Sequence, residues 1–236
     1  MQSNNAQRAY DHVFAKLMSG QYKPGTRLLY GPIGKEIGVS ATPVREAIGR
    51  LASQGYVNLV PNLGAVVREP DRDEVVELYE IRAALECCAV QKAATQRSDQ
   101  QLEYLNELLS QLKHFALLLR QDKLEVLSPE QMNHYLAVDE SFHAYIMQVA
   151  GNKRLLKMVR DLRILARIFR DYERDRPRFK QIVITYRYHA QIVRAIRDGD
   201  AKRARDWMRQ HIDRGLTEMI LHHDQRHAQK VWPETP

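Results

Sequence analysis

The chain has only one place for a pair of strands, and this place divides it into two different parts. Short apolar runs at 56–60 and 65–68 flank a turn-forming Pro-Asn-Leu-Gly cluster. Beyond Pro70 the apolar residues recur every three or four positions with few helix breakers, a spacing typical of helices. We therefore predict a mainly α protein with one domain at 1–70 and a second, all-helical domain at 71–236.

Start and stop signals divide the second domain into helices. Ser, Asp and Asn cap helix starts, proline fits the first turn, and glycine ends helices or makes turns. The expected boundaries lie at Asp71, Ser98, Ser128-Pro129, Gly151-Asn152, Asp175-Arg176-Pro177 and Asp198-Gly199-Asp200.

The basic charge is denser in the first domain. The formal net charge of the chain is +7. Residues 1–70 hold eight Lys or Arg against four Asp or Glu, whereas the remaining residues hold 28 against 25. The first domain therefore fits a polyanionic partner, although many basic proteins bind none.

Cysteine usage and hydropathy both favour a cytoplasmic protein. The two cysteines, Cys87 and Cys88, are neighbours and cannot join distant segments. No apolar run is long enough to span a bilayer, and residues 1–5 lack the basic-then-apolar pattern of a signal peptide. We expect no membrane partner.

The first domain reads as a winged helix-turn-helix. Helices are predicted at 7–18, 32–37 and 42–54, with Thr42 as the N-cap of the third and Pro43 in its first turn. The hairpin follows as a wing. This arrangement places the third helix in the major groove of DNA and the wing on the adjacent backbone.

The third helix has one buried face and one basic face. Its apolar stripe is formed by Val44, Ala47, Ile48 and Leu51. Arg45 and Arg50 point away from that stripe and are candidate DNA contacts, because arginine is the usual reader of bases and phosphates. The alternative for Arg45 is an ordinary solvated arginine.

The first domain resembles the GntR family of bacterial regulators. The resemblance rests on Gly38-Val39-Ser40-Ala41-Thr42-Pro43-Val44-Arg45-Glu46-Ala47-Ile48, Leu51, Gly55-Tyr56-Val57 and Pro61-Asn62-Leu63-Gly64. It implies DNA contacts from Arg45, from the segment around Ser40 and Thr42, and from a wing tip at Gly64.

Four positions depart from the family pattern. Ala41 stands where the family usually has arginine, Leu63 where the wing is usually basic, Tyr30 where an acidic residue is common, and Gly49 where arginine is frequent. Each lost arginine–guanine pair removes roughly 1–3 kcal/mol of discrimination. We expect an atypical operator or weaker specific binding.

Three histidines and an aspartate in the second domain form a candidate metal site. Asp139 and His143 are four residues apart on one helix and share a face. His189 precedes Gly199 by ten residues and His211 follows it by twelve, so helices that fold back at this glycine bring both to similar heights. Three imidazoles and a carboxylate suit Zn²⁺ or Ni²⁺, with open positions if the ion is octahedral. The alternative is histidines that are neighbours without an ion.

The second domain resembles the FCD effector domain of the FadR-like branch of this family. The matching segments are Glu80–Glu86, Asp139–His143, Gly151-Asn152, His189–Ile196, Gly199-Asp200, Ala204 and Met208–His211. The resemblance implies an antiparallel helical bundle with metal ligands at Asp139, His143, His189 and His211. It also implies that Arg82 faces a cavity and pairs with a ligand carboxylate. The alternative for Arg82 is a salt bridge with Glu86.

The other histidines and an arginine stripe have plainer interpretations. His222, His223 and His227 are expected to be solvated, and His12, His114 and His134 to be isolated. The arginine stripe is either a solvated or dimer-facing surface or a rim that attracts an anion or DNA. It consists of Arg160, Arg163, Arg167, Arg170 and Arg174.

The sequence thus predicts a transcription regulator and not an enzyme. We expect a homodimer on a palindromic operator, gated by a small organic acid at a divalent metal ion. One alternative is a regulator with weakened operator reading that acts through protein partners. Another is a helical metallo-hydrolase, which lacks a well-placed general base because Glu140 turns away from the ligand face. The sequence leaves open the acid, the metal, the operator and the sign of regulation.

Overall fold

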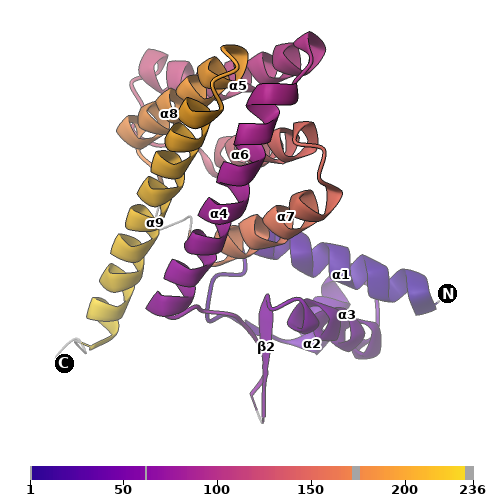
Figure 1. The fold of residues 1–236 in the computed structure, drawn as a ribbon. Helices are drawn as coiled ribbons and strands as arrows, with labels where there is room; N and C mark the ends of the chain where they lie inside the picture. Colours follow the sequence, from indigo (N-terminus) through magenta and orange to yellow (C-terminus); the bar gives the residue numbers. More distant parts are fainter. Residues whose placement is uncertain (1, 62, 172–175, 232–236) are drawn as a thin grey trace. The chain divides into compact units, whose positions relative to one another are not determined.

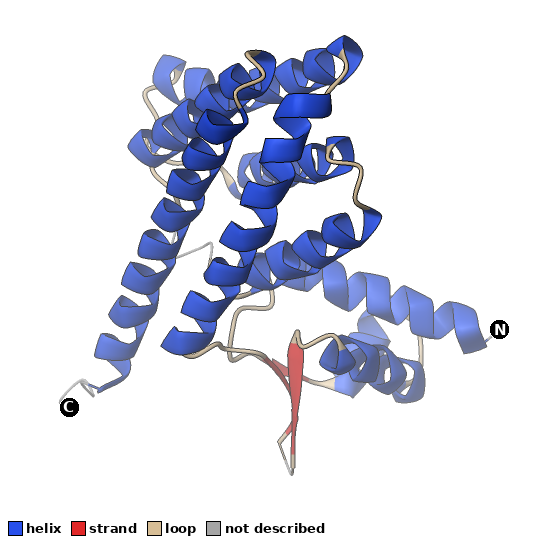
Figure 2. Ribbon diagram, in the orientation of Figure 1, coloured by secondary structure: helices blue, strands red, loops and turns tan. Residues whose placement is uncertain are grey.

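A computed structural model describes residues 2–61, 63–171 and 176–231, and this part of the chain is mainly helical, as predicted (Figures 1 and 2). Among the described residues, those up to 71 and those at 164–171 form one compact unit. Those at 72–163 and from 176 onward form the other. No helix in the described residues is long and apolar enough to cross a membrane.

In the described residues, the first unit contains three complete helices and a small antiparallel sheet. Its elements are α1 (Gln2–Met18), β1 (Arg27–Leu28), α2 (Tyr30–Ile37), α3 (Ala41–Ser53), β2 (Val57–Val60) and β3 (Gly64–Val67). The strands are ordered β1-β3-β2, with Val57 opposite Val67 and Arg27 opposite Val66. This is a winged helix-turn-helix.

The structure corrects two details of the first domain. The predicted hairpin has a third strand, β1, which is only two residues long and therefore shows no alternation in sequence. Ser40, and not Thr42, is the N-cap of α3, with extended backbone angles and no side-chain cap hydrogen bond. Thr42 and Pro43 lie in the first turn of the helix.

The helix-turn-helix depends on a close approach at Gly34. The core of this unit includes Val13 of α1 and the predicted stripe of α3 from Val44 to Leu51. A Cβ atom at Gly34 would lie 2.6 Å from the backbone oxygen of Val39 in the following turn. The turn can therefore pack onto α2 only because this residue has no side chain.

Six helices of the described part of the chain contribute to the second unit. They are α4 (Arg72–Gln96), α5 (Asp99–Gln121), α6 (Pro129–Val149), α7 (Lys153–Ile168), α8 (Phe179–Arg197) and α9 (Ala201–Val231). The last residues of α7, from Ile164, belong to the first unit. Ser98 and Ser128 form capping boxes, and the Asn152 side chain accepts hydrogen bonds from the backbone at the start of α7. These caps lie where the sequence predicts them. The predicted break at Asp175 lies outside the described residues.

The turn between α8 and α9 folds two long helices against each other. Gly199 adopts a left-handed φ of +72°, which favours glycine, and the Asp200 amide donates back to the Ala195 carbonyl. The Asp200 side chain then accepts from the Arg203 amide and caps α9. α9 packs against both α8 and α4, and Figure 1 shows α4 and α9 side by side.

Candidate metal centre

The second unit brings the four predicted ligands together from three helices. Asp139 and His143 project from α6, His189 from α8 and His211 from α9. His143 and His189 are fully buried, whereas Asp139 and His211 are partly buried. The imidazole centroids of His189 and His211 are 4.7 Å apart, so both histidines lie at the same height beside the α8–α9 turn.

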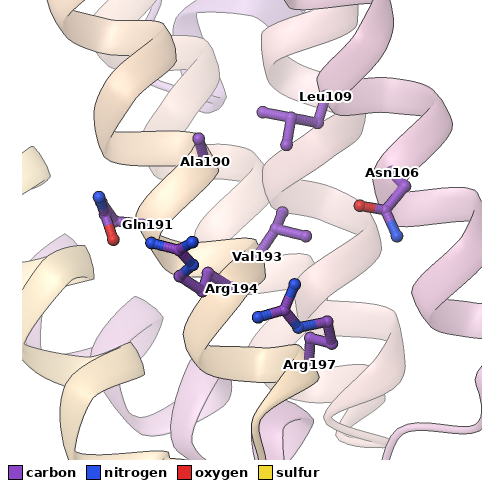
Figure 3. A pocket seen from close by; sticks show the side chains of 7 residues that line it. All are labelled: Asn106, Leu109, Ala190, Gln191, Val193, Arg194 and Arg197. Atoms are coloured by element: carbon purple, nitrogen blue, oxygen red, sulfur yellow. The ribbon is translucent and has the colours of Figure 1, made fainter.

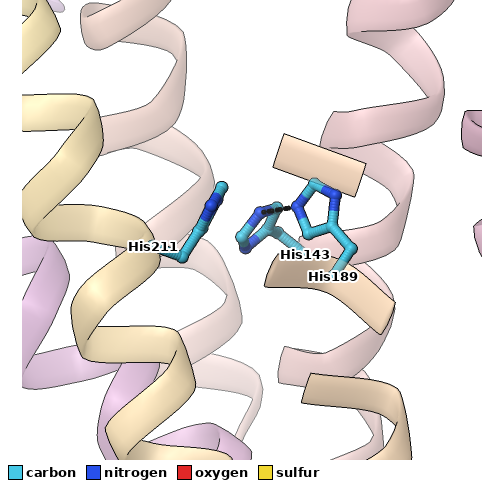
Figure 4. A group of neighbouring side chains, drawn as sticks. All are labelled: His143, His189 and His211. Carbon is cyan, nitrogen blue, oxygen red and sulfur yellow. Dashed lines mark hydrogen bonds between the residues drawn. The ribbon is translucent and has the colours of Figure 1, made fainter. Parts of the chain in front are cut away.

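The side chains of His143, His189 and His211 lie close together, and a hydrogen bond joins His143 to His189 (Figure 4). One ligand atom from each of His143, His189 and His211 lies within 4.8 Å of the other two. The Nε2 atoms of His143 and His189 are 3.2 Å apart. Two nitrogens bound to one tetrahedral zinc at 2.0–2.1 Å would be separated by about 3.3 Å. Asp139 adds an oxygen, since its Oδ1 lies 3.4 Å from His189 Nε2. The donor set and its spacing fit a divalent transition-metal ion.

Glu86 of α4 determines which nitrogen of His143 is available. Its Oε2 lies 2.8 Å from His143 Nδ1, so in the neutral imidazole the proton belongs on Nδ1, facing the carboxylate. The lone pair is then on Nε2, which faces His189. Metal-binding histidines commonly have a carboxylate in this position.

The interior holds the imidazoles neutral and the carboxylates ionised. Burial lowers the pKa of His189 to about 3 and also lowers the pKa values of His143 and His211. Burial acts to raise the pKa of Asp139, but the positive charge of Arg163 outweighs it, so the pKa is lowered. Neutral imidazole and ionised carboxylate are the forms that bind metal ions.

Two arginines complete the buried cluster. Arg82 Nε donates to Glu86 Oε1 at 2.9 Å, and the Arg82 guanidinium lies over the ring of Tyr79. The structure therefore contains the Arg82–Glu86 salt bridge considered as the alternative for Arg82. Arg163 of α7 donates to Asp139 Oδ2 at 2.5 Å and lies 3.7 Å from Glu86 Oε2.

Sequence reasoning missed the roles of Glu86 and Arg163. The sequence predicts Glu86 only as a salt-bridge partner, and its place four residues after Arg82 on the same helix is the available signal. The sequence pattern places Arg163 in the arginine stripe. A solvated surface is wrong for this residue, because its side chain is only 11% exposed.

The other arginines of the stripe differ in exposure and in their contacts. Arg160 is exposed, as a surface reading predicts, whereas Arg167 donates to the Met18 carbonyl at the end of α1. Arg174 lies outside the described residues.

The remaining histidines lie elsewhere. His223 is buried beside Asp224, so the prediction that it is solvated is wrong; no side-chain environment is described for His227. His12 lies 3.4 Å from Glu36.

The predicted DNA contacts lie on α3 and the wing. Ser40, Thr42 and Arg45 are exposed, and the Arg45 guanidinium lies 5.5 Å from the ring centroid of Tyr30. Arg50 is also exposed, as predicted, but it is held against α1. It donates to Gln7 Oε1 at 3.0 Å and lies 4.2 Å from the Tyr10 ring centroid. At the wing, Gly64 has a φ of +87° and the preceding Leu63 is 50% exposed.

A surface cavity of about 270 Å³ lies between α5 and α8, and none of the three histidines lines it (Figure 3). Asn106 and Leu109 line it from α5, and Arg194 and Arg197 from α8. Arg197 is paired with Asp198. We find no arrangement of metal ligands among the residues that line this cavity.

Family comparisons agree with both domains. Residues 77–214 match the FCD domain, and residues 5–67 match the bacterial regulatory proteins of the gntR family. The chain belongs to the GntR family and carries an FCD domain.

Similar proteins are named as transcriptional regulators. The Nta operon transcriptional regulator of Aminobacter aminovorans is 32% identical over 145 residues, which cover 61% of this chain and 63% of the relative. The transcriptional repressor RspR of Escherichia coli is 27% identical over 75% of this chain and 73% of its own length. These matches support the prediction of a DNA-binding transcription regulator of the GntR type.

Solved structures share the fold. The E. coli McbR/YncC structure has a TM-score of 0.76 at 22% identity and covers 93% of this chain and 98% of its own. A GntR regulator from Rhodococcus sp. RHA1 has a TM-score of 0.72 at 20% identity, over 92% of this chain and 98% of its own.

Proposed function

We propose that this GntR-family regulator binds a palindromic DNA operator as a homodimer under the control of a small organic acid. The observation that carries the effector half of this proposal is the convergence of three histidines and one aspartate from α6, α8 and α9 in the interior of the second unit. The basic first unit, with its winged helix-turn-helix, supports the DNA half. A DNA partner and two free thiols fit a cytoplasmic location.

DNA reading is assigned to α3 and the wing. Arg45 would reach base edges from an exposed face of α3, and Ser40 and Thr42, exposed at the start of this helix, would contact phosphates. Gly64 lets the wing backbone approach DNA closely. Arg50, held by Gln7 and Tyr10, is suited to a fixed phosphate contact.

A divalent ion such as Zn²⁺ or Ni²⁺ would be held by Asp139, His143, His189 and His211. The ion supplies a positive centre with positions open to an acid if its coordination exceeds four. Glu86 keeps His143 in the ligating tautomer, and Arg163 orients Asp139. Arg82 is the proposed partner of the acid's carboxylate, which requires that it share its guanidinium with Glu86.

The acid can control DNA binding only if its affinity differs between two arrangements of the protein. An acid changes operator occupancy only if it binds one arrangement of the dimer better than another. The same acid must raise the melting temperature of the protein, so a thermal screen of small carboxylates with metal-loaded protein would find it.

Metal analysis of the full chain tests the site directly. We expect close to one Zn²⁺ per chain in wild type and a large loss in His189→Ala. His114→Ala is the matched control because His114 is exposed on α5. Equal metal content in wild type and His189→Ala would refute the site.

A second candidate is a regulator that reads operators weakly and acts through partner proteins. The exposed Leu63 at the wing and the exposed Ala41 favour it, because neither can make a charged DNA contact. A gel-shift series with the upstream region of its own gene separates the two. Sequence-specific binding that weakens steeply with salt supports operator reading, whereas weak, sequence-blind binding supports the partner model.

A further inference from the structure

The buried cluster around the candidate metal centre is balanced in charge before any ion binds. Its charged members are the guanidinium groups of Arg82 and Arg163 and the carboxylates of Glu86 and Asp139. Glu86 and Arg82 are almost wholly buried, and the side chains of Arg163 and Asp139 are 11% and 18% exposed. The two positive and two negative charges therefore neutralise each other inside the protein.

A divalent ion breaks this balance. The three ligating imidazoles must be neutral to bind a metal, so they add no charge of their own. A Zn²⁺ ion then leaves the cluster with two uncompensated positive charges in a buried site. An excess of buried charge is costly unless a counter-ion pairs with it.

Arg163 is the group placed to share a counter-ion with the metal. Its guanidinium contacts Asp139, the only carboxylate among the four proposed ligands, while Asp139 Oδ1 faces the histidines. Its Nε is buried and has no hydrogen-bond partner among the described residues. Arg163 therefore has an unused donor on the guanidinium that contacts the proposed ligand Asp139, whereas Arg82 Nε is already bonded to Glu86.

We propose that the effector is a compact dianion, such as a small dicarboxylate, and that Arg163 is its second anchor. One carboxylate binds the metal, and the other pairs with Arg163. This inference rests on the proposed function, since it needs an ion at the histidines. It adds to that function the charge of the acid, and it adds Arg163 as a binding residue beside Arg82 and the metal ligands.

Calorimetric titration of the full chain loaded with Zn²⁺ tests the proposal, with malonate and acetate as probes. Wild type should bind malonate at least tenfold more tightly than acetate. Arg163→Met, loaded with Zn²⁺ to the same content as wild type, should lose most of the preference for malonate over acetate, so that the ratio of the two affinities falls at least tenfold. Arg194→Met is the matched control because Arg194 lines the separate α5–α8 cavity, and it should change neither affinity.

The possible failures are distinguishable. Wild type that binds no Zn²⁺ refutes the metal centre in the proposed function. Zn²⁺-loaded wild type that binds malonate and acetate equally well overturns the dianion proposal alone. An Arg163→Met variant whose affinities for malonate and acetate fall equally also overturns the dianion proposal. If Arg163→Met does not fold, Arg163→Lys replaces it. This variant keeps the charge and should keep the preference for malonate, and loss of that preference would contradict the charge argument.

Discussion

Glu86 and His143 face each other in the interior of the second unit, with Glu86 Oε2 2.8 Å from His143 Nδ1. Glu86 also accepts from Arg82, so one carboxylate joins an arginine on its own helix to a histidine on α6. It acts both as a structural counter-ion and as the group that orients a proposed ligand.

Glu86→Gln should therefore lower both stability and metal affinity. Two buried guanidinium groups would lose part of their compensation, which should cost about 3 kcal/mol or more of the free energy of unfolding. Zn²⁺ affinity should fall roughly 10- to 100-fold, because His143 loses the partner that fixes its tautomer. Chemical denaturation and competitive Zn²⁺ titration measure the two effects.

Glu80→Gln provides the control for this substitution. Glu80 is an exposed glutamate on the same helix, so the change should alter stability by less than about 0.5 kcal/mol. Identical behaviour of the two variants would contradict the role given to Glu86.

Gly34→Ala should destabilise the first unit. The added methyl group would meet the Val39 carbonyl oxygen at 2.6 Å, a backbone atom that cannot move without opening the helix-turn-helix. We expect a loss of about 1–3 kcal/mol in thermal or chemical unfolding, with Zn²⁺ binding unchanged.

Gly31→Ala is the matched change on the same helix. A Cβ atom there meets nothing within 4 Å, so alanine should be neutral or stabilise α2 by up to about 1 kcal/mol. The argument from close packing fails if both alanine variants have the same stability.

Arg45→Ala and Arg50→Ala should weaken DNA binding in different ways. Arg45 is expected to read a base, so its loss should cost about 1–3 kcal/mol and relax the preference at one operator position. Arg50 is expected to contact a phosphate, so its loss should weaken binding to all sequences and reduce the salt slope by about one. Gel-shift titrations with operator variants at several salt concentrations measure both. Unchanged sequence preference in Arg45→Ala would contradict its assignment.

The two neighbouring thiols should differ sharply in reactivity. Burial, together with the charge of Glu86, raises the pKa of Cys87 to about 11, and its Sγ lies 3.7 Å from the Arg205 carbonyl oxygen. Little Cys87 thiolate therefore exists at pH 8, whereas Cys88 is exposed. A disulfide reagent at pH 8 should label one thiol quickly, and Cys88→Ser should abolish that fast phase. A fast phase that survives in Cys88→Ser would show that Cys87 is accessible.

The sequence was sufficient where a structural relation depends on one helix or one turn. His189 and His211 could be placed together because a single glycine turn joins their helices and 1.5 Å of rise per residue gives their heights. Arg45 and Arg50 could be assigned to an exposed face from the periodicity of α3.

Relations between separate helices could not be predicted in this way. Periodicity places Arg163 beside the apolar stripe of α7, but it does not reveal that Asp139 of α6 lies opposite. In the same way, periodicity does not reveal that Glu86 of α4 lies opposite His143 of α6. The prediction of the α3 N-cap was wrong for a local reason. Ser40 and Thr42 both suit an N-cap, and only the backbone angles distinguish them.

The effect of an inserted residue on the histidine group depends on whether the insertion lies in the turn at Gly199 or within α8 or α9. A residue inserted between Asp200 and His211 would rotate His211 by about 100° around the axis of α9 and move its imidazole out of the ligand group. A residue inserted within the turn itself would leave the count from the start of α9 to His211 unchanged. Related chains that keep the histidines should therefore tolerate insertions and deletions in the α8–α9 turn, but not between this turn and His189 or His211. Engineered insertions should be placed in the turn.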